Sequence, residues 1–588
     1  MTYLYLFLSF FFLISKACQN NRGGGTRKPW LQDDNYYMQV KQGQLIGKDA
    51  GDYLAFYNIP FAKPPVDNLR WKKPENPNGW SGVRNAIDIS NVKGCPQSEG
   101  GLNSPEGGVS EDCLYLNIFM PKPEIIENSS LKKRPIMLWI HGGSYTSGSG
   151  ALPGYNGGYL AAYHGVIVIS INYRLGSFGF LYDQDIEKTN HEIVGNQGIY
   201  DMIKAMEWVR DNVDSFYGDR DKITIFGQSA GGQAVTTLLS LKNDTNLNYH
   251  NYFNQAIAQS PPLGLLYRTK SEATDEAKKL LEKLGCNQPN NDKNPEIKKW
   301  ECARSKTWKE VLDAQNKVRG LIDADKISSI IEPWTPVLDD ILLDKHPYYS
   351  LIDGRSWNKK IMMGHTTGEG DIFVYAVGGV PLGKREYQLL MKKFFAKDNI
   401  YNEVLKQYPS PCGDFAPGCD ARSALGRIAS SYLFDCPIRR ALGRRSLTIE
   451  PNNGVTYKYL FGQPVYQIPA LPKLAREACS RTSCHSADLP YIFGTYEDYN
   501  LDFDDSEERF VDKMQTYWAN FALTGSPNIR ESRIDEFPGK EIEEVPCWQR
   551  YTSANTDDCK GWGSSYTLKK CKKNSLTTGF EPVRAEPK

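Results

Sequence analysis

The stretch Phe226–Gly232, FGQSAGG, places a serine between two glycines in the pattern G-x-S-x-G. This pattern is short and the chain contains 51 glycines, so by itself it says little about reactivity. The flanking segments say more. Lys222–Phe226 has the apolar, branched composition of a buried strand, and Gln233–Ser240 is compatible with a helix. The serine therefore lies at a predicted strand-to-helix turn.

Two earlier apolar runs predict strands of the same sheet. Pro135–Ile140 and Val166–Asn172 are nearly continuous in branched apolar residues, which is typical of strands covered on both faces. Asp201–Val213 lies between these runs and the serine turn, and its apolar residues have helical spacing. The order strand, helix, strand, serine turn and helix predicts an α/β fold with a large, mostly parallel central sheet flanked by helices.

A strand that feeds G-x-S-x-G and then a helix is the nucleophile elbow of α/β-hydrolases. The glycines allow a sharp turn that lifts the serine hydroxyl clear of the sheet. The hydroxyl needs a base to become nucleophilic at neutral pH, and a carboxylate must hold that base in the right tautomer. In this fold the chain order is Ser, then Asp or Glu, then His.

The seven histidines narrow the search for the base. Five either precede Ser229 or lie in polar, surface-like contexts: His141, His164, His191, His250 and His346. Of the remaining two, His365 ends a hydrophobic run four residues before Glu369, and this glycine-flanked glutamate is the candidate acid. His485 then follows as the candidate base. A structural role is the ordinary alternative for any single histidine, and the joint pattern is what favours catalysis.

A second glycine-rich segment predicts an oxyanion hole. Trp139–Ser144, WIHGGS, follows the strand at Pro135–Ile140, as the HGGG-type loop of esterases does. Its backbone N–H groups, with that of Ala230 after the serine, would point at the developing alkoxide. The alternative is a glycine-rich turn without a ligand.

Three further motifs carry a family resemblance: Glu111–Phe119 (EDCLYLNIF), Asn172–Phe180 (NYRLGSFGF) and Gly195–Asp201 (GNQGIYD). With the elbow and the HGG loop, they make the chain resemble the type-B carboxylesterase and cholinesterase family of α/β-hydrolases, over about residues 37–521. The resemblance extends to the vesicular esterases of social amoebae.

The resemblance implies Ser229 as nucleophile, Glu369 as triad acid and His485 as general base. By the same positions, the oxyanion donors are Gly143, Ser144 and Ala230. It implies a small-molecule ester substrate and no metal or organic cofactor.

The resemblance also implies disulfides. The expected pairs are Cys95 with Cys113 and Cys286 with Cys302; a pair of Cys436 with Cys559 is suggested but left open. The pairing of six other cysteines is left open: Cys412, Cys419, Cys479, Cys484, Cys547 and Cys571. A bridge between Cys479 and Cys484 would stiffen the His485 loop, although a purely structural bridge is the commoner outcome.

Three departures from the family pattern bear on specificity. Gln228 stands before the serine where many members have glutamate, which removes a negative charge that would attract a cationic substrate. Ser144 replaces a glycine and requires an uncommon φ. The loop from Cys95 to Cys113 lacks the tryptophan that stacks on choline in cholinesterases. We therefore expect a general esterase rather than a choline-specific one.

The N-terminal segment predicts an exported chain. Residues 1–17 have the short apolar run and small residues of a cleaved signal peptide. Residues 18–588 are expected to form one domain, with a core at about 37–521 and a cysteine-rich C-terminal extension. The segments at about 400–450 and beyond 540 are interpreted as loop-rich additions.

No integral membrane segment is expected, and the 70 basic residues against 69 acidic ones argue against nucleic acid as a partner. Oxidised cysteines and the sequons at Asn128 and Asn243 fit a secretory route. Oligomerisation stays open.

Two functions remain at this point. The first is a secreted or vesicular serine esterase that works through an acyl-enzyme. The second is a non-catalytic family member with a storage, packing or adhesion role. Such relatives usually lack the serine or the histidine, whereas this chain has Ser229, Glu369 and His485.

Overall fold

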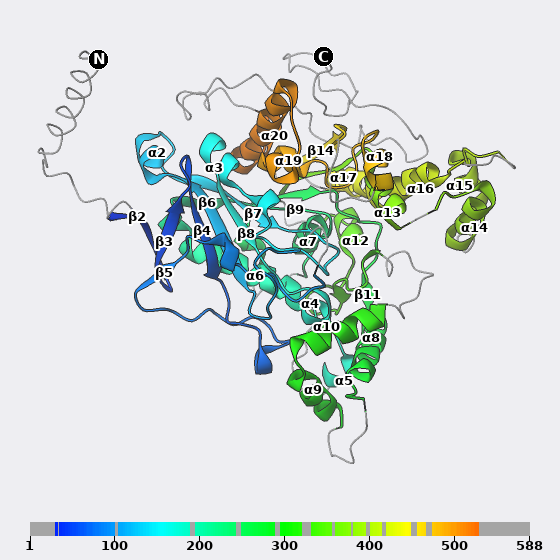
Figure 1. The fold of residues 1–588 in the computed structure, drawn as a ribbon, viewed down its shortest axis with the longest axis horizontal. Helices are drawn as coiled ribbons and strands as arrows, with labels where there is room; N and C mark the ends of the chain where they lie inside the picture. The colour runs from blue at the N-terminus through cyan, green and yellow to red at the C-terminus, as the bar shows by residue number, and fades with distance from the viewer. Residues whose placement is uncertain are drawn as a thin grey trace, which may run out of the picture.

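One large sheet organises the computed structural model (Figure 1). The structure describes residues 30–528 except 33–34, 100–103, 188–194, 243–248, 288–294, 320–330, 356–358, 378–379, 396–399, 414–418, 449–454 and 466–472. Within these residues twelve strands join in the order β1-β2-β3-β4-β6-β8-β7-β9-β10-β13-β14, with β5 paired to β3. The strands of this sheet are β1 (Leu31–Gln32), β2 (Asn35–Val40), β3 (Gly43–Asp49), β4 (Tyr53–Pro60), β5 (Val83–Asn85), β6 (Tyr115–Pro121), β7 (Arg134–Ile140), β8 (Ile167–Ile171), β9 (Gly218–Gln228), β10 (Gln255–Gln259), β13 (Lys360–Thr366) and β14 (Thr456–Phe461). A small second sheet pairs β11 (Arg268–Thr269) with β12 (Val337–Leu338).

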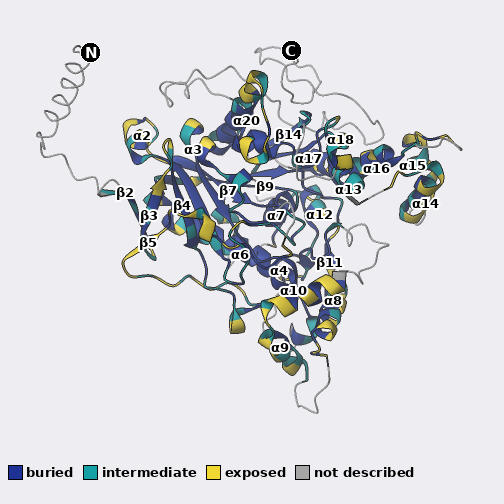
Figure 2. Ribbon diagram, in the orientation of Figure 1, coloured by how far each residue is buried: buried dark blue, intermediate teal, exposed yellow. Residues whose placement is uncertain are grey.

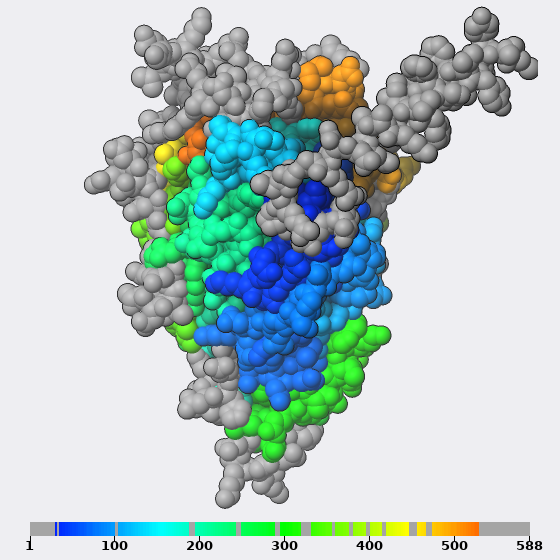
Figure 3. All heavy atoms as spheres, turned by 90° about the vertical axis from the view of Figure 1, so that its left-hand side faces the viewer, coloured from blue at the N-terminus to red at the C-terminus, as the bar shows by residue number. Residues whose placement is uncertain are grey.

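The expected parallel sheet is confirmed for the run β8-β7-β9-β10-β13-β14, in which each neighbouring pair is parallel. The three strands expected from apolar runs are its members β7, β8 and β9. The sheet continues through β6, β4, β3, β2 and β1, whose neighbouring pairs are antiparallel, and β5 pairs with β3 in parallel, so that the sheet is mixed as a whole. Figure 3 shows these N-terminal strands in blue on one side of the molecule.

Helices cover the sheet and extend beyond it. Their bounds are α2 (Pro123–Asn128), α3 (Gly158–His164), α4 (Gly176–Phe180), α5 (Gln184–Glu187), α6 (Gln197–Asn212), α7 (Ala230–Leu238), α8 (Lys270–Lys283), α9 (Pro295–Ser305), α10 (Trp308–Arg319), α12 (Pro347–Ile352), α13 (Glu369–Val377), α14 (Lys384–Phe395), α15 (Tyr401–Gln407), α16 (Arg422–Ala429), α17 (Cys436–Thr448), α18 (Lys473–Cys479), α19 (Leu489–Phe493) and α20 (Asp505–Thr524). The two helices expected around the serine turn are confirmed as α6 and α7. No helix in the described ranges combines the length and apolarity that a membrane crossing needs.

The central strand β7 is buried at every position, as its continuous apolar sequence predicts. Alternate residues face opposite layers. Leu138 and Ile140 belong to the same apolar cluster as residues of α6 and α7, whereas Trp139 packs with residues of α19 and α20. Figure 2 shows the central strands as buried and the outer sides of α8, α9 and α14 as exposed. The sheet is therefore held between two helical layers.

The segment 400–450 differs from the expectation. It is mainly helical, with α15, α16 and α17 and a π-helix at Ser430–Asp435 between the last two. Pro409, Pro411, Cys412 and Cys419, which are described, lie between α15 and α16. After them, Leu425, Ile428 and Leu433 recur at helical intervals and pack inward.

Both disulfides expected with described partners are confirmed, Cys95–Cys113 and Cys286–Cys302. Two pairings that stayed open are also present, Cys412–Cys419 and Cys479–Cys484. The suggested pairing of Cys436 cannot be compared, since Cys559 lies outside the described residues.

Several other expectations lie outside the described residues: the signal peptide, the tail beyond 540, and Asn243. Asn128 is described and lies exposed at the end of α2. His346 was expected in a surface-like context, and this is wrong. It is buried at the start of α12, where its Nε2 bonds the Leu265 carbonyl oxygen at 3.0 Å.

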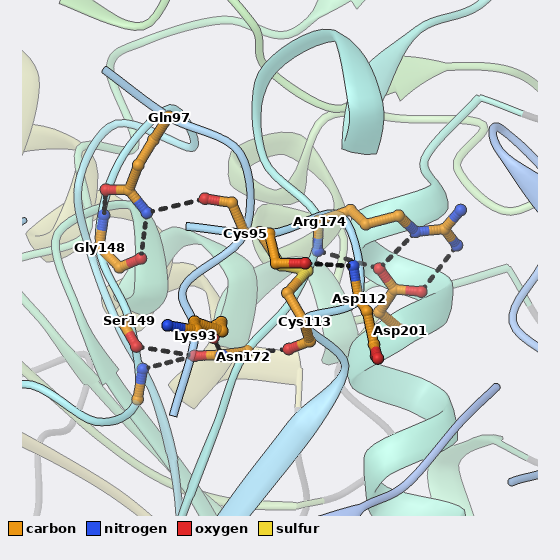
Figure 4. Close-up of a disulfide and its surroundings, with 12 residues drawn as sticks. Lys93, Cys95, Gln97, Asp112, Cys113, Gly148, Ser149, Asn172, Arg174 and Asp201 are labelled. Atoms are coloured by element: carbon orange, nitrogen blue, oxygen red, sulfur yellow. Dashed lines mark hydrogen bonds and ion pairs between the residues drawn. A yellow bond between two sulfur atoms is a disulfide. The ribbon is translucent and has the colours of Figure 1, made fainter. Parts of the chain in front are cut away.

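Residues of the family motifs form hydrogen bonds and an ion pair around the Cys95–Cys113 disulfide (Figure 4). Asn172 accepts a hydrogen bond from the Gly150 N–H at 2.8 Å and donates one to the Cys113 carbonyl at 3.0 Å. Two residues further on, Arg174 forms a buried ion pair with Asp201 at 2.7 Å. These contacts join the 95–113 disulfide loop, the segment after β8 and helix α6 into one support.

Candidate active site

The serine turn has the strained geometry of a nucleophile elbow. Ser229 follows β9 and precedes α7, with φ of 60° and ψ of −128°. A non-glycine residue at such values costs of order 1–3 kcal/mol and persists only where the surrounding structure enforces it. Ser229 is half-buried, and its N–H donates to the Gln259 carbonyl at 2.9 Å. The expectation of a sharp strand-to-helix turn is confirmed.

The neighbouring glycines are required by close backbone approach. A Cβ on Gly227 would lie 2.6 Å from the Ile140 carbonyl oxygen, and one on Gly231 would lie 2.0 Å from the same atom. Side chains at either position would push β9 and α7 away from the end of β7. The pattern G-x-S-x-G therefore brings the serine turn against the segment that follows β7.

The HGG loop lies directly beside the serine. A Cβ on Gly142 would lie 3.0 Å from the Ser229 Cβ and 2.7 Å from the Gln228 carbonyl oxygen. Gly143 and Ser144 follow with φ of 107° and 55°, so the uncommon φ expected at Ser144 is present. Among the described residues, the backbone N–H groups of Gly143, Ser144 and Ala230 have no hydrogen-bond partner. They are available to an oxygen atom bound beside Ser229.

Backbone hydrogen bonds and the side chain of Gln97 hold the HGG loop and the turn after it in place. The Gly143 carbonyl accepts hydrogen bonds from the N–H groups of Thr146 and Ser147, at 2.9 and 3.0 Å. Gln97 bonds both the N–H and the carbonyl of Gly148 at 2.8 Å each, as Figure 4 shows. The loop is thus a compact turn anchored to the disulfide loop.

His141 is structural. It is buried, stacks on the ring of Tyr173 at 4.4 Å, and bonds the Gly142 carbonyl through Nδ1 at 2.8 Å. Burial lowers the pKa of His141 to about 4, so the ring is neutral at physiological pH.

Glu369 and His485 meet as predicted. His485 Nδ1 is hydrogen-bonded to Glu369 Oε2. Glu369 begins α13 directly beyond β13, is fully buried, and accepts a second hydrogen bond from the Thr366 N–H at 2.6 Å. Burial alone would raise the pKa of Glu369, but the charge and hydrogen bond of His485 hold it below its ordinary value. Glu369 is therefore an ionised acceptor that fixes the Nδ1–H tautomer of His485.

Two short connections hold this pair together. His485 lies in the loop between α18 and α19, and the disulfide Cys479–Cys484 closes that loop against the end of α18. Gly368, the residue before Glu369, donates its N–H to the Ser483 carbonyl at 2.8 Å and forms a bridge with Cys484. The acid and the base are therefore tied through neighbouring backbone.

Two aromatic rings enclose His485. Phe373 of α13 lies 5.1 Å and Phe434 of the π-helix 5.3 Å from the imidazole, centroid to centroid. Sequence reasoning did not find either ring. Phe373 lies one turn after Glu369 and could have been found from that spacing, whereas no local pattern connects Phe434 to the site.

The other ring nitrogen of His485 is occupied by Gln228. The side-chain Nε2 of Gln228 lies 3.0 Å from His485 Nε2. No hydrogen bond joins the Ser229 hydroxyl to His485, both of which are described. The structure thus places Gln228, the neighbour of Ser229, against the imidazole that Glu369 bonds.

One more carboxyl group, that of Asp488, lies near the site. Asp488, three residues after His485, is fully buried and accepts hydrogen bonds from Gln259 and Tyr459, each at 3.2 Å. Burial, with the nearby Glu369 charge, raises the pKa of Asp488 to about 6. Its spacing from His485, less than one helical turn, is a signal that sequence reasoning left unused.

His365 is not the base. Its Nε2 bonds Asp435 at 2.9 Å, and Lys458 lies 3.3 Å from the same carboxylate. This charge cluster joins β13, β14 and the π-helix. The nearby Lys458 and His365 charges counter the effect of burial and lower the pKa of Asp435 well below its ordinary value.

A strained serine beside free N–H groups, with a carboxylate–imidazole pair at hand, defines the class of serine hydrolases with an α/β-hydrolase fold. Comparisons with known proteins identify the family. The model of the Carboxylesterase family matches residues 34–571, and the chain belongs to that family.

Curated relatives agree. The chain is 33% identical over 507 residues to the cAMP-regulated D2 protein of Dictyostelium discoideum, covering 85% of this chain and 86% of that protein. It is 31% identical to the Crystal protein of the same organism, covering 83% and 82%. Identity to the Cholinesterase of Mus musculus is 29%, covering 90% and 84%.

Solved structures show the same fold. A PNB esterase matches with a TM-score of 0.68 and 26% identity, covering 88% of this chain and 94% of that one. A second structure of that esterase gives a TM-score of 0.69 at 25% identity, with the same coverage. With the family membership, these matches make the chain a carboxylic ester hydrolase.

Proposed function

We propose that the chain hydrolyses small carboxylic esters through an acyl-enzyme on Ser229, with His485 as general base and Glu369 as the orienting acid. The observation that carries the proposal is the hydrogen-bonded Glu369–His485 pair beside a serine held at φ of 60°. An ionised, buried glutamate on Nδ1 leaves the Nε2 lone pair as the proton acceptor, which is what attack by a serine hydroxyl requires.

Acylation follows from this arrangement. His485 Nε2 takes the Ser229 proton while Oγ forms a bond to the ester carbonyl carbon, and the carbonyl electrons move to oxygen. The N–H groups of Gly143, Ser144 and Ala230 bond that oxyanion. Its collapse breaks the bond to the alkoxy group, which leaves with the proton from His485.

Deacylation repeats the same steps with water. His485 takes a proton from water, whose oxygen attacks the acyl carbon, and the second tetrahedral intermediate releases the acid and restores Ser229.

We expect uncharged esters rather than choline esters as substrates. Gln228 is neutral and 3% exposed, so the residue before the nucleophile adds no negative charge that would attract a cation. The described part of the 95–113 loop, like its sequence, contains no tryptophan to stack on a quaternary ammonium group.

A non-catalytic storage or adhesion role is the second candidate. One relative bears the printed name Crystal protein, which concerns that protein alone. Against this role in the present chain stands the cost of the strained Ser229 backbone and of a fully buried, ionised Glu369. A purely structural chain has no need of either.

We propose a secretory or vesicular location. The disulfides support it, because such bonds persist in oxidising compartments. The exposed Asn128, in an Asn-Ser-Ser sequon, is an accessible glycan acceptor. A mass decrease on endoglycosidase treatment of chain made in a secretory host, absent in Asn128→Gln/Asn243→Gln, would support the route; an unmodified secreted chain would count against the glycan.

Steady-state hydrolysis of nitrophenyl esters of rising chain length, with a choline ester included, tests the function. Ser229→Ala is expected to lower kcat by about 10⁴–10⁶, and His485→Ala by a similar factor, because the triad acts as a unit. Ser229→Ala turnover close to that of wild type would refute the mechanism. Fast turnover of the choline ester would refute the substrate preference.

A further inference from the structure

Both ring nitrogens of His485 are engaged in the structure, and the Nε2 contact involves a residue that the triad mechanism does not use. Glu369 bonds Nδ1, and the Gln228 amide nitrogen lies 3.0 Å from Nε2. The Nε2 lone pair of His485, which would accept the Ser229 proton, therefore already has a hydrogen-bond partner in this structure.

The protonation state follows from the partners. Glu369 is an ionised acceptor, so Nδ1 carries the hydrogen. When the ring is neutral, Nε2 has only a lone pair, and the Gln228 amide N–H can donate to it. This contact suits a neutral imidazole. In a protonated ring Nε2 would carry a hydrogen, and this N–H would face the amide N–H, so that two donors would meet without an acceptor.

The position of Gln228 is tightly defined. It ends β9, its side chain is 3% exposed, and its Oε1 would lie 3.3 Å from a Cβ on Gly142. Phe373 and Phe434 limit movement of the ring that it contacts. Gln228 directly precedes Ser229, and in the proposed mechanism the Gln228 amide and the Ser229 hydroxyl use the same Nε2 lone pair.

We propose that Gln228 is a positioning residue that covers the Nε2 lone pair of His485 at rest and must release it before Ser229 can be deprotonated. The inference rests on the proposed function. It assigns the Gln228 amide a direct part in controlling the base, beyond its lack of charge. Each acylation then includes the loss of one amide–imidazole hydrogen bond.

The rate of labelling by a fluorescent organophosphonate measures this step, because labelling needs the same serine and base. Gln228→Met keeps a side chain of similar length and removes both amide groups. We expect the second-order labelling rate of folded Gln228→Met to rise about three- to tenfold, the effect of one net hydrogen bond. An unchanged or lower rate would overturn the proposal.

Gln515→Met is the matched control. Gln515 of α20 is also buried and its Oε1 lies 3.1 Å from a histidine nitrogen, His164 Nε2, away from the serine. Its loss is expected to leave the labelling rate unchanged. An equal acceleration in Gln515→Met would trace the effect to general loosening and refute a specific role for Gln228.

Gln228→Glu gives a second readout that does not depend on tolerance of methionine. A carboxylate can only accept, so it would hold the ring in its protonated form. The titratable groups around His485 are Glu369 of α13, Asp488 before α19, and Tyr459 of β14, with His365 of β13 beside Glu369. These are common to both proteins, so a difference between the two profiles reports position 228.

The acid-side half-maximum of kcat/KM is expected to move to higher pH by at least one unit in Gln228→Glu, because a neighbouring negative charge typically has an effect of that size. An unshifted profile would overturn the proposal. If wild type itself is not labelled whereas the chain is folded, the proposed function fails. If wild type is labelled and the variants match it, only the role of Gln228 fails.

Discussion

Ser144 lies at φ of 55° between Gly143 and Tyr145, whose φ values are also positive. Its backbone N–H is the group proposed to bond the oxyanion, and its side chain is incidental to that role. We therefore expect Ser144→Ala and Ser144→Gly to keep kcat/KM within about threefold of wild type, whereas loss of an oxyanion donor typically costs about 10²–10³. Steady-state kinetics on a nitrophenyl ester checks this, and a loss of 10² in both variants would assign the donor to the hydroxyl instead.

Glu332 is an ionisable residue that the mechanism leaves unused. It is 2% exposed, and its Oε2 has no hydrogen-bond partner within the described chain. Burial raises the pKa of Glu332 to about 8, against an ordinary value of 4.5. Between these pH values the unfolded chain loses the proton while the folded chain keeps it. Stability contributed by this group therefore falls as pH rises from about 4.5 to 8 and is constant above.

Glu332→Gln removes that titration. The penalty that it relieves at pH 9 is at most about 5 kcal/mol, which corresponds to the full separation of the two pKa values. We expect the Tm of Glu332→Gln minus that of wild type to increase between pH 5 and pH 9 in calorimetric scans. Glu369 and Asp435 contribute a pH dependence of stability with the opposite sign. This contribution is the same in both proteins and cancels in the difference between their Tm values. A constant or shrinking difference would contradict a neutral Glu332 in the native state.

At this scale the sequence predicts which side chains lie together, and their reactivity stays a prediction. Ser229 was identified by its glycines, and Glu369 and His485 by their order in a chain with seven histidines. The Gln228 contact was out of reach, because it depends on the rotamer of one amide beside a residue 257 positions away. Chain order identifies which residues meet, and packing decides which atoms touch.

Among the elements, the α13 start and the His485 loop form the unit that aligns the base. The Cys479–Cys484 disulfide closes a short loop whose last residue precedes His485. In the chain-entropy description such a loop contributes about 2 kcal/mol to stability. Both cysteines are buried, which shields the bridge from exchange with solvent thiols.

We expect Cys479→Ser/Cys484→Ser to lower kcat/KM by about 10- to 100-fold, since small displacements of a catalytic group have effects of that order. The matched control is Cys412→Ser/Cys419→Ser, which removes a disulfide between α15 and α16 and should lower Tm with activity kept. Kinetics and thermal melting on both pairs test this. Equal activity losses in the two variants would show a general effect of destabilisation.

The prediction of helices from the sequence failed in the segment where prolines and cysteines are frequent. Between 409 and 419 the prolines and cysteines are dense, and this suggested loops across 400–450. The following helices α16 and α17 were missed because their apolar residues are interrupted by arginines such as Arg422, Arg439 and Arg445. All three are buried at less than 10% exposure. Arg422 is paired with Asp420, and Arg445 with Thr456. Because these arginines are buried with partners, the sequence of a helix that faces the core looks like that of a polar segment.

For the whole molecule, the α/β architecture followed from three central strands because strands buried on both faces have a strong apolar signal. The antiparallel part was not resolved from the sequence. In β2, NYYMQV, tyrosine occupies both the buried position 36 and the partly buried position 37, so the alternation of polar and apolar residues that predicts a half-buried strand is weak. The extent of the sheet, from β1 to β14, is a property of long-range pairing that local patterns do not contain.

The central claim is that Ser229 is the nucleophile of a carboxylic ester hydrolase. Reaction with an organophosphonate, followed by digestion and mass mapping of the adduct, tests it most directly. The account predicts one adduct per chain on the peptide that contains Ser229, none in Ser229→Ala, and a much slower reaction in His485→Ala. A folded chain that forms no adduct, or one that carries the adduct on another residue and keeps it in Ser229→Ala, would contradict the account.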